Sequence, residues 1–276
     1  MTRILNRWLR RVGLPRLTRL LLLISLPPMW LEIAILHYRG SFQSPFMWLP
    51  IAGLPLVVAG GVATLFAGDD GRERALFRPL AWLATALGAA GTLFHIGGVK
   101  RQMGGFYNLK YNLMTGPPVP APPQLALLGL AAVVASDPGE VGKSRYRQRR
   151  KLVRRLFLIE ALAAASLAIE AGYEHYKGYF FNPFMLIPVT LGPALAVVHL
   201  AALVWQRPTR ALRRWLSAAA MVLSLVGFAF HVYNVTVRRT GGFSWQNLFY
   251  GAPVVAPLQL FAHGALGLLA AFFEEP

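Results

Sequence analysis

Two segments of this chain repeat ionisable side chains at the same spacing. Residues 32–50 align without a gap with residues 170–188, and nine of the nineteen positions are identical. A further histidine recurs later in each copy. The recurring ionisable residues are Glu32/Glu170, His37/His175 and His95/His231. Carboxylates within a membrane protein handle protons or cations, and neutral imidazole ligates haem iron or a metal ion. The pattern therefore predicts one of these two chemistries.

The similarity continues downstream and carries amide side chains. Residues 112–125 match residues 247–260 in the pattern Asn-Leu-x-x-Gly-x-Pro-Val-x-Ala-Pro-x-Gln-Leu. A residue kept in both copies is more informative than one present once, so we interpret the chain as a tandem duplication. We expect polar neighbours of the site at Asn112/Asn247, Gln124/Gln259 and Tyr38/Tyr176.

The composition is that of a polytopic membrane protein. Of the 276 residues 55% are hydrophobic and 14% are charged, with a mean hydropathy of +0.47. A membrane helix needs about 20 apolar residues. Stretches of this kind lie at 20–38, 47–67, 79–99, 119–136, 154–175, 184–205, 213–236 and 255–273. We predict an all-α integral membrane protein with eight transmembrane helices, arranged as two tandem, parallel-repeated four-helix bundles.

The net charge of +17 is explained by topology. Of the 28 Lys and Arg residues, 21 fall in the N-terminal segment and in alternate loops that share one side of the membrane. This is the positive-inside rule, and it places both termini in the cytoplasm. We therefore expect no nucleic-acid binding, and a multi-pass location in the plasma (inner) membrane of a prokaryote. The chain has no cysteine, so disulfides and thiolate ligands are excluded.

The connector between the copies is polar, basic and punctuated by Gly and Pro. It divides the chain into four parts. We predict a basic interfacial tail at 1–19, a first membrane repeat at 20–136, a cytoplasmic connector at 137–153 and a second membrane repeat at 154–276.

The duplicated polar residues all fall toward the outer face. The first and third helices of a four-helix bundle are diagonal, so His37 and His95 can converge and clamp haem b or a metal ion. Residues five apart on an α-helix point about 140° from each other. Glu32 and His37 thus cannot face one centre unless the helix carries a π-bulge or unwinds before Gly40.

Three arrangements remain open for each copy. The first is a His/His ligand pair, with the glutamate handling protons. The second is a mixed metal site with Glu32 or Glu170 beside two histidines and a Gln124 or Gln259 neighbour. The third is a hydrogen-bonded network that pins the outer loops. His199 aligns with Gly61 and His263 with Leu128, so we expect these two histidines to be core or cavity residues.

In outline, two tandem four-helix bundles with outer histidine pairs are similar to haem A synthase. The histidines of that family fall on the second and fourth helices of each bundle, whereas these fall on the first and third, so no activity is transferred. The first hypothesis is an electron-transfer protein with haem b or metal centres and a quinone or membrane redox partner. The second is a proton- or cation-coupled transporter using Glu32 and Glu170. The third is a non-catalytic subunit of a membrane complex or an assembly factor that docks a partner through its outer loops.

Overall fold

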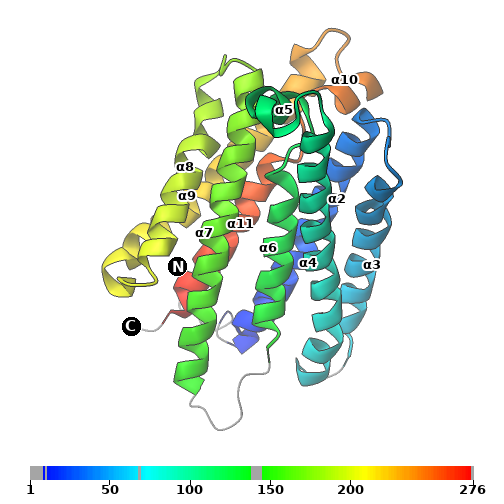
Figure 1. Cartoon of the computed structure of the whole chain (residues 1–276). Helices are drawn as coiled ribbons and strands as arrows, with labels where there is room; N and C mark the ends of the chain where they lie inside the picture. The colour runs from blue at the N-terminus through cyan, green and yellow to red at the C-terminus, as the bar shows by residue number, and fades with distance from the viewer. Residues whose placement is uncertain (1–8, 10, 68–69, 138–144, 275–276) are drawn as a thin grey trace.

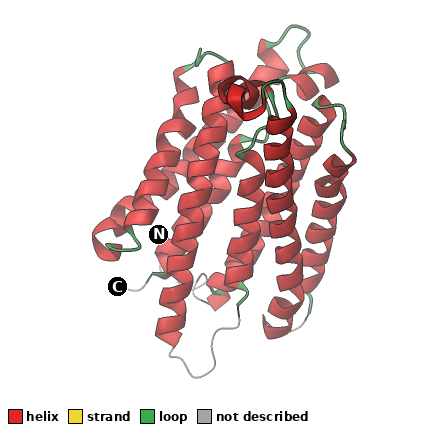
Figure 2. Cartoon of the chain, in the orientation of Figure 1, coloured by secondary structure: helices red, strands yellow, loops and turns green. Residues whose placement is uncertain are grey.

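The computed structural model describes residue 9 and residues 11–67, 70–137 and 145–274. Across these residues the chain forms helices and no strand (Figure 2), which confirms the all-helical prediction. Residues 1–8 and 10 of the predicted interfacial tail and residues 138–144 of the predicted connector lie outside the described residues.

Long helices run side by side along one axis (Figure 1). In the N-terminal half they are α2 (Leu14–Arg39), α3 (Trp48–Thr64), α4 (Asp70–Arg101) and α6 (Ala121–Ala135). In the C-terminal half they are α7 (Arg145–Lys177), α8 (Leu186–Ala201), α9 (Gln206–Tyr233) and α11 (Pro257–Phe273). The short helices α5 (Leu109–Thr115) and α10 (Trp245–Tyr250) lie at the same end of the molecule.

Within the described part of the chain, five helical segments are long and apolar enough to cross a membrane. They are Leu14–Arg39, Pro45–Thr64, Gly71–Arg101, Pro183–Ala201 and Gln206–Arg238. Helices α6 and α11 are apolar but shorter. Large apolar side chains such as Ile24, Leu93 and Val197 point outward, as expected of a surface that contacts lipid. The chain is therefore a helical membrane protein.

Each half arranges its helices in a ring. Helix α3 packs against α2 and α4, and α6 also packs against α2 and α4, so α2 and α4 are diagonal. In the same way α8 and α11 each pack against α7 and α9. The halves meet where α6 packs against α7 and α2 packs against α11. The first and last helices of the two halves, α2, α6, α7 and α11, thus form a third ring at the centre.

Small residues bring the helices close together, as is common between membrane helices. A Cβ atom added at Gly88 would lie 2.3 Å from the backbone nitrogen of Ala126, and one at Gly192 would lie 2.8 Å from the Cβ of Ala168. These contacts join α4 to α6 and α8 to α7.

Helix α9 passes into a π-helix, η4 (Asn234–Arg238). In the first half Val99 follows His95 by four residues, whereas in the second half the matching Val237 follows His231 by six. The π-helix accommodates the additional residues without ending the helix. Helix α2, in contrast, is α-helical up to Arg39 and continues through Pro27 and Pro28.

Candidate functional site

All four duplicated histidines make the same kind of contact. The Nδ1 atoms lie 2.9 Å from Met47 O for His37, 2.8 Å from Pro118 O for His95, 2.6 Å from Met185 O for His175 and 2.5 Å from Pro253 O for His231. A carbonyl oxygen only accepts, so each Nδ1 carries the hydrogen in these contacts and each Nε2 is left with a lone pair. Every imidazole therefore joins its helix to the segment that begins the next helix, and keeps one nitrogen able to accept a proton or ligate a metal.

The histidines of diagonal helices approach each other in both halves. The ring centroids of His175 and His231 are 6.4 Å apart, with an angle of 64° between the ring planes. His37 lies close enough to His95 for the two rings to interact electrostatically. The structure thus brings together each pair of imidazoles that the sequence placed on the first and third helices.

A strained turn follows the first histidine of each half. Ser41 and Phe42 have φ angles of 54° and 46°, and Tyr179 and Phe180 have φ angles of 56° and 47°. Residues with side chains rarely adopt this left-handed region. The turns direct the Phe42 ring to 6.4 Å from the His37 ring, and the Phe180 ring to 6.3 Å from the His175 ring. Such strain persists where the surrounding structure fixes it and is typical of functional sites.

The duplicated glutamates lie at the junction of the halves. Glu32 is buried, with 4% of its surface exposed, and the Val255 backbone of the other half lies beside its carboxyl group. Glu170 accepts a hydrogen bond from the side chain of Gln124, again across the junction. The two carboxyl groups also interact electrostatically with each other, and both interact with Glu174.

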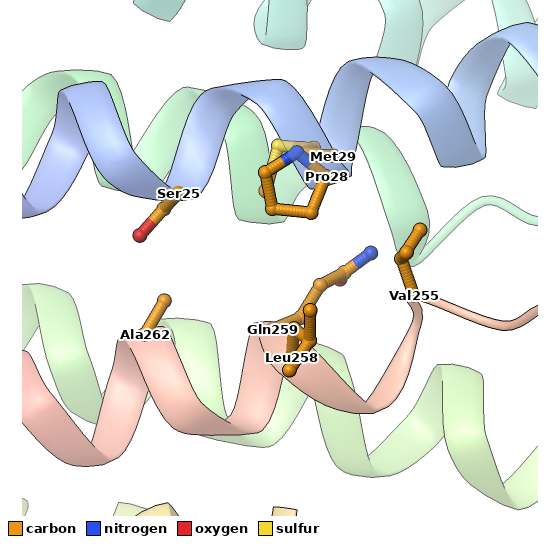
Figure 3. A pocket seen from close by; sticks show the side chains of 7 residues that line it. All are labelled: Ser25, Pro28, Met29, Val255, Leu258, Gln259 and Ala262. Carbon is orange, nitrogen blue, oxygen red and sulfur yellow. The ribbon is translucent and has the colours of Figure 1, made fainter. Parts of the chain in front are cut away.

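A small pocket lies one helical turn from Glu32. Pro28 and Met29 of α2 line one side, and Val255 and Gln259 line the other. Gln259 extends its amide into the space between α2 and α11 (Figure 3). Both glutamine side chains therefore extend toward the opposite half. Gln124 extends toward α7, which carries Glu170, and Gln259 extends toward α2, which carries Glu32.

The structure separates the glutamates from the histidines. Because α2 is α-helical from Leu14 to Arg39, Glu32 faces the central ring while His37 faces His95. The described ranges contain no group of three or more His, Asp or Glu residues placed to hold a metal ion. A mixed Glu/His/His metal site is therefore not formed by the residues that the structure describes.

The remaining duplicated residues belong to the outer loops. The Asn112 amide donates to Met103 O and Gly105 O, and the Asn247 amide donates to Thr240 O and Gly242 O. These bonds hold the Gly-Gly turns that follow α4 and α9. Tyr38 and Tyr176 are about half exposed at the helix ends. Asn112 and Asn247 thus organise loops, and their side chains bond to those loops instead of to the imidazoles or carboxylates.

One important residue was missed by the sequence analysis. Arg39 donates from Nε to Phe249 O, and its Nη2 lies 2.7 Å from Gly251 O, so the first half holds the outer loop of the second. Arg39 also interacts electrostatically with Glu32. The sequence signal was a basic residue at the same position in both copies, Arg39 and Lys177.

Comparison of the chain with protein-family models, with curated proteins and with solved structures finds no match. The similarity to haem A synthase therefore remains one of outline, and the function has to be argued from the site itself.

Proposed function

We propose that this chain is a membrane transport protein that binds a proton or a small cation between Glu32 and Glu170. One observation carries the proposal: Glu32 of the first half is buried and Glu170 of the second half accepts from Gln124 across the junction, with each carboxyl group within electrostatic range of the other. Two carboxylates close together in a medium of low dielectric constant cannot both stay ionised without a counter-charge. Arg39 acts on Glu32 and Lys177 pairs with the neighbouring Glu174, so two basic groups face three carboxyl groups. A proton or cation supplies the third positive charge, and the Gln124 amide positions the Glu170 carboxyl group.

Transport also requires a defined orientation. We propose that the long helices of the two halves cross the membrane eight times as a tandem repeat, with the chain ends in the cytoplasm of a prokaryotic cell. The basic distribution of the sequence supports this topology. The binding site then lies toward the outer face, where α2 and α7 end.

The topology can be tested directly because the chain has no cysteine. Single cysteines at the exposed positions Tyr107 and Tyr179 should react with a membrane-impermeant maleimide added outside intact cells. Cysteines at Phe66 and Asp137 should react only after the cells are opened. Labelling of either of the latter two from outside would contradict the eight-span arrangement.

Proton flux into liposomes tests the transport proposal. The purified protein is reconstituted with a trapped pH-sensitive dye, and a membrane potential is imposed. The wild type should acidify the lumen, and the flux should be lost in Glu32→Gln and in Glu170→Gln. Asp137→Asn is the matched control, since this acid forms a half-exposed ion pair with Arg155 away from the junction. Replacing Na⁺ and K⁺ by a large organic cation separates proton from cation flux. Folded Gln variants with wild-type flux of either kind would refute the proposal.

The imidazole pairs support a second candidate, electron transfer through haem b. His175 and His231, whose ring centroids are 6.4 Å apart, would hold the haem through their Nε2 atoms, and the haem iron would supply one-electron chemistry. Haem supplies four ligands itself, so two histidines suffice. A quinone in the lipid phase would be the redox partner.

Optical spectroscopy tests this candidate. The detergent-purified protein should show a Soret band that is lost in His175→Ala and His231→Ala and kept in Trp245→Phe, a change at an exposed residue of α10. A colourless wild type, purified from cells supplied with haem precursors, would rule the candidate out.

A further inference from the structure

The second half contains a buried polar cluster that the first half lacks. Its members are Glu160 on α7, His199 on α8, Ser217 on α9 and His263 on α11, and none is more than 2% exposed. The matching residues of the first half are Leu22, Gly61, Ala81 and Leu128. Three of these, Leu22, Ala81 and Leu128, belong to one hydrophobic core cluster. The arrangement of helices therefore does not require polar side chains at this level, and the cluster needs another explanation.

The four side chains converge on one face of α11. His263 Nδ1 lies 3.3 Å from Glu160 Oε2. One turn further along, a Cβ atom added at Gly267 would lie 2.7 Å from Ser217 Oγ and 2.9 Å from His199 Nε2. The glycine thus leaves room for two polar atoms directly below the Glu160–His263 pair.

Several atoms of the cluster need a partner. Among the residues that the structure describes, Glu160 Oε1, His199 Nε2 and Ser217 Oγ are buried and accept or donate no hydrogen bond. Buried polar atoms in folded proteins are nearly always satisfied by protein or by internal water, because leaving one unpaired costs about 1–3 kcal/mol. A metal ion is not the fitting ligand, since no three ligating groups meet in the described ranges.

We propose that the second half holds a proton-binding site in which Glu160 and His263 share one exchangeable proton. His199 and Ser217 bind the internal water through which that proton arrives. A proton taken from hydronium is held between Glu160 Oε2 and His263 Nδ1, and its release to water returns a carboxylate and a neutral imidazole. The site is separate from the Glu32–Glu170 junction and does not depend on it.

Few charged or titratable side chains lie near the Glu160–His263 pair on the helices that pack around it. From α9, Arg213 lies with its guanidinium 4.6 Å from the ring centroid of Phe157, and it is paired with Glu274 at the end of α11. From α8 the facing group is His199, whose ring is stacked on Phe157. Helix α6, which also packs on α7, has no ionisable residue in its sequence. Glu274 is shared between Arg213 and Arg210, so it does not neutralise both guanidinium groups, and Arg213 acts electrostatically on His199. The proton equilibrium of the cluster therefore includes the field of Arg213.

Infrared difference spectroscopy between acidic and alkaline buffer tests the site. The C=O band of a protonated carboxylic acid should appear on acidification of the wild type. The Glu32–Glu170 junction contributes its own component, so the component that belongs to Glu160 should vanish in Glu160→Gln and persist in Glu170→Gln. In His263→Gln it should persist at a shifted position, because the hydrogen-bond partner has changed. A Glu160→Gln spectrum identical to that of the wild type would overturn the proposal.

A second variant separates this role from a structural one. Glu160→Leu/His263→Leu gives the second half the residues that the first half carries at the matching positions. Exchange of a buried ionisable pair for apolar residues of similar size is often neutral or stabilising. The double variant should therefore unfold at the wild-type temperature or above and lose the Glu160 component of the band. A markedly lower unfolding temperature, together with a wild-type band that does not change with pH, would show that the pair only holds the fold together.

Discussion

The strength of the hydrogen bond between Gln124 and Glu170 reports whether the Glu170 carboxyl group at the junction is ionised or neutral. Gln124 is fully buried on α6, and its amide donates to the carboxyl group of Glu170 on α7. Replacing Gln124 by Leu removes the donor and keeps most of the volume. The energy lost depends on whether the acceptor is an ionised or a neutral carboxyl group.

The magnitudes differ enough to decide between these cases. A hydrogen bond to a charged group contributes about 1.5–3 kcal/mol, and one between neutral groups about 0.5–1.5 kcal/mol. Measured couplings between membrane helices average about 0.6 kcal/mol. In the proposed site the shared proton is placed on Glu170, whose carboxyl group accepts from the Gln124 amide. We therefore expect a coupling of about 0.5–1.5 kcal/mol.

A double-mutant cycle measures this coupling. The wild type, Gln124→Leu, Glu170→Leu and the double variant are unfolded by denaturing detergent in mixed micelles, and tryptophan fluorescence gives each free energy of unfolding. Gln43→Leu combined with Glu170→Leu is the control, since Gln43 lies in an exposed loop, and distant sites couple by less than about 0.5 kcal/mol. A coupling near 3 kcal/mol would mean that Glu170 is ionised and would refute the assignment of the proton. A coupling indistinguishable from the control would mean that the contact is not made.

Two further predictions concern packing and the outer loops. Gly88→Ala should lower the free energy of unfolding by about 1–3 kcal/mol, because the new Cβ would meet the backbone of α6. Gly172 has open space around it, so Gly172→Ala is the control and should be neutral or stabilising. Equal effects of the two substitutions in thermal unfolding would contradict this account of the helix contact. Arg39→Ala should raise the rate at which a protease cuts the loop near Gly251, because that loop loses its hydrogen bonds to the guanidinium group. An unchanged cleavage rate would show that other contacts hold the loop.

The recurrence of residues 32–50 at 170–188 made much of the site predictable. The order of the apolar segments predicted that His37 and His95 lie on the first and third helices of one half. Because these helices are diagonal in the bundle, the two side chains can meet at its centre. The angle between residues five apart also indicated that Glu32 and His37 need different partners unless α2 is irregular, and α2 is a regular α-helix up to Arg39.

The partners across the junction could not be predicted in the same way. Helical periodicity tells which residues share a face, and it does not tell which other helix that face meets. The central ring formed by α2, α6, α7 and α11 depends on the packing of two halves far apart in sequence. The contact of Gln124 with Glu170, and that of Glu32 with Val255, were therefore outside the reach of a single sequence.

The matched histidines and the matched glutamates differ in the partners that they contact. The imidazoles satisfy local needs, since each binds a carbonyl of its own half, so both copies can keep the same contact independently. Glu32 and Glu170 instead lie at the junction of the halves, within electrostatic range of each other, so acids at both positions place two like charges near one interface. Apolar residues there would be cheaper than a pair of acids. The presence of both Glu32 and Glu170 agrees with the proposed site, in which a proton or a small cation needs both carboxyl groups at once.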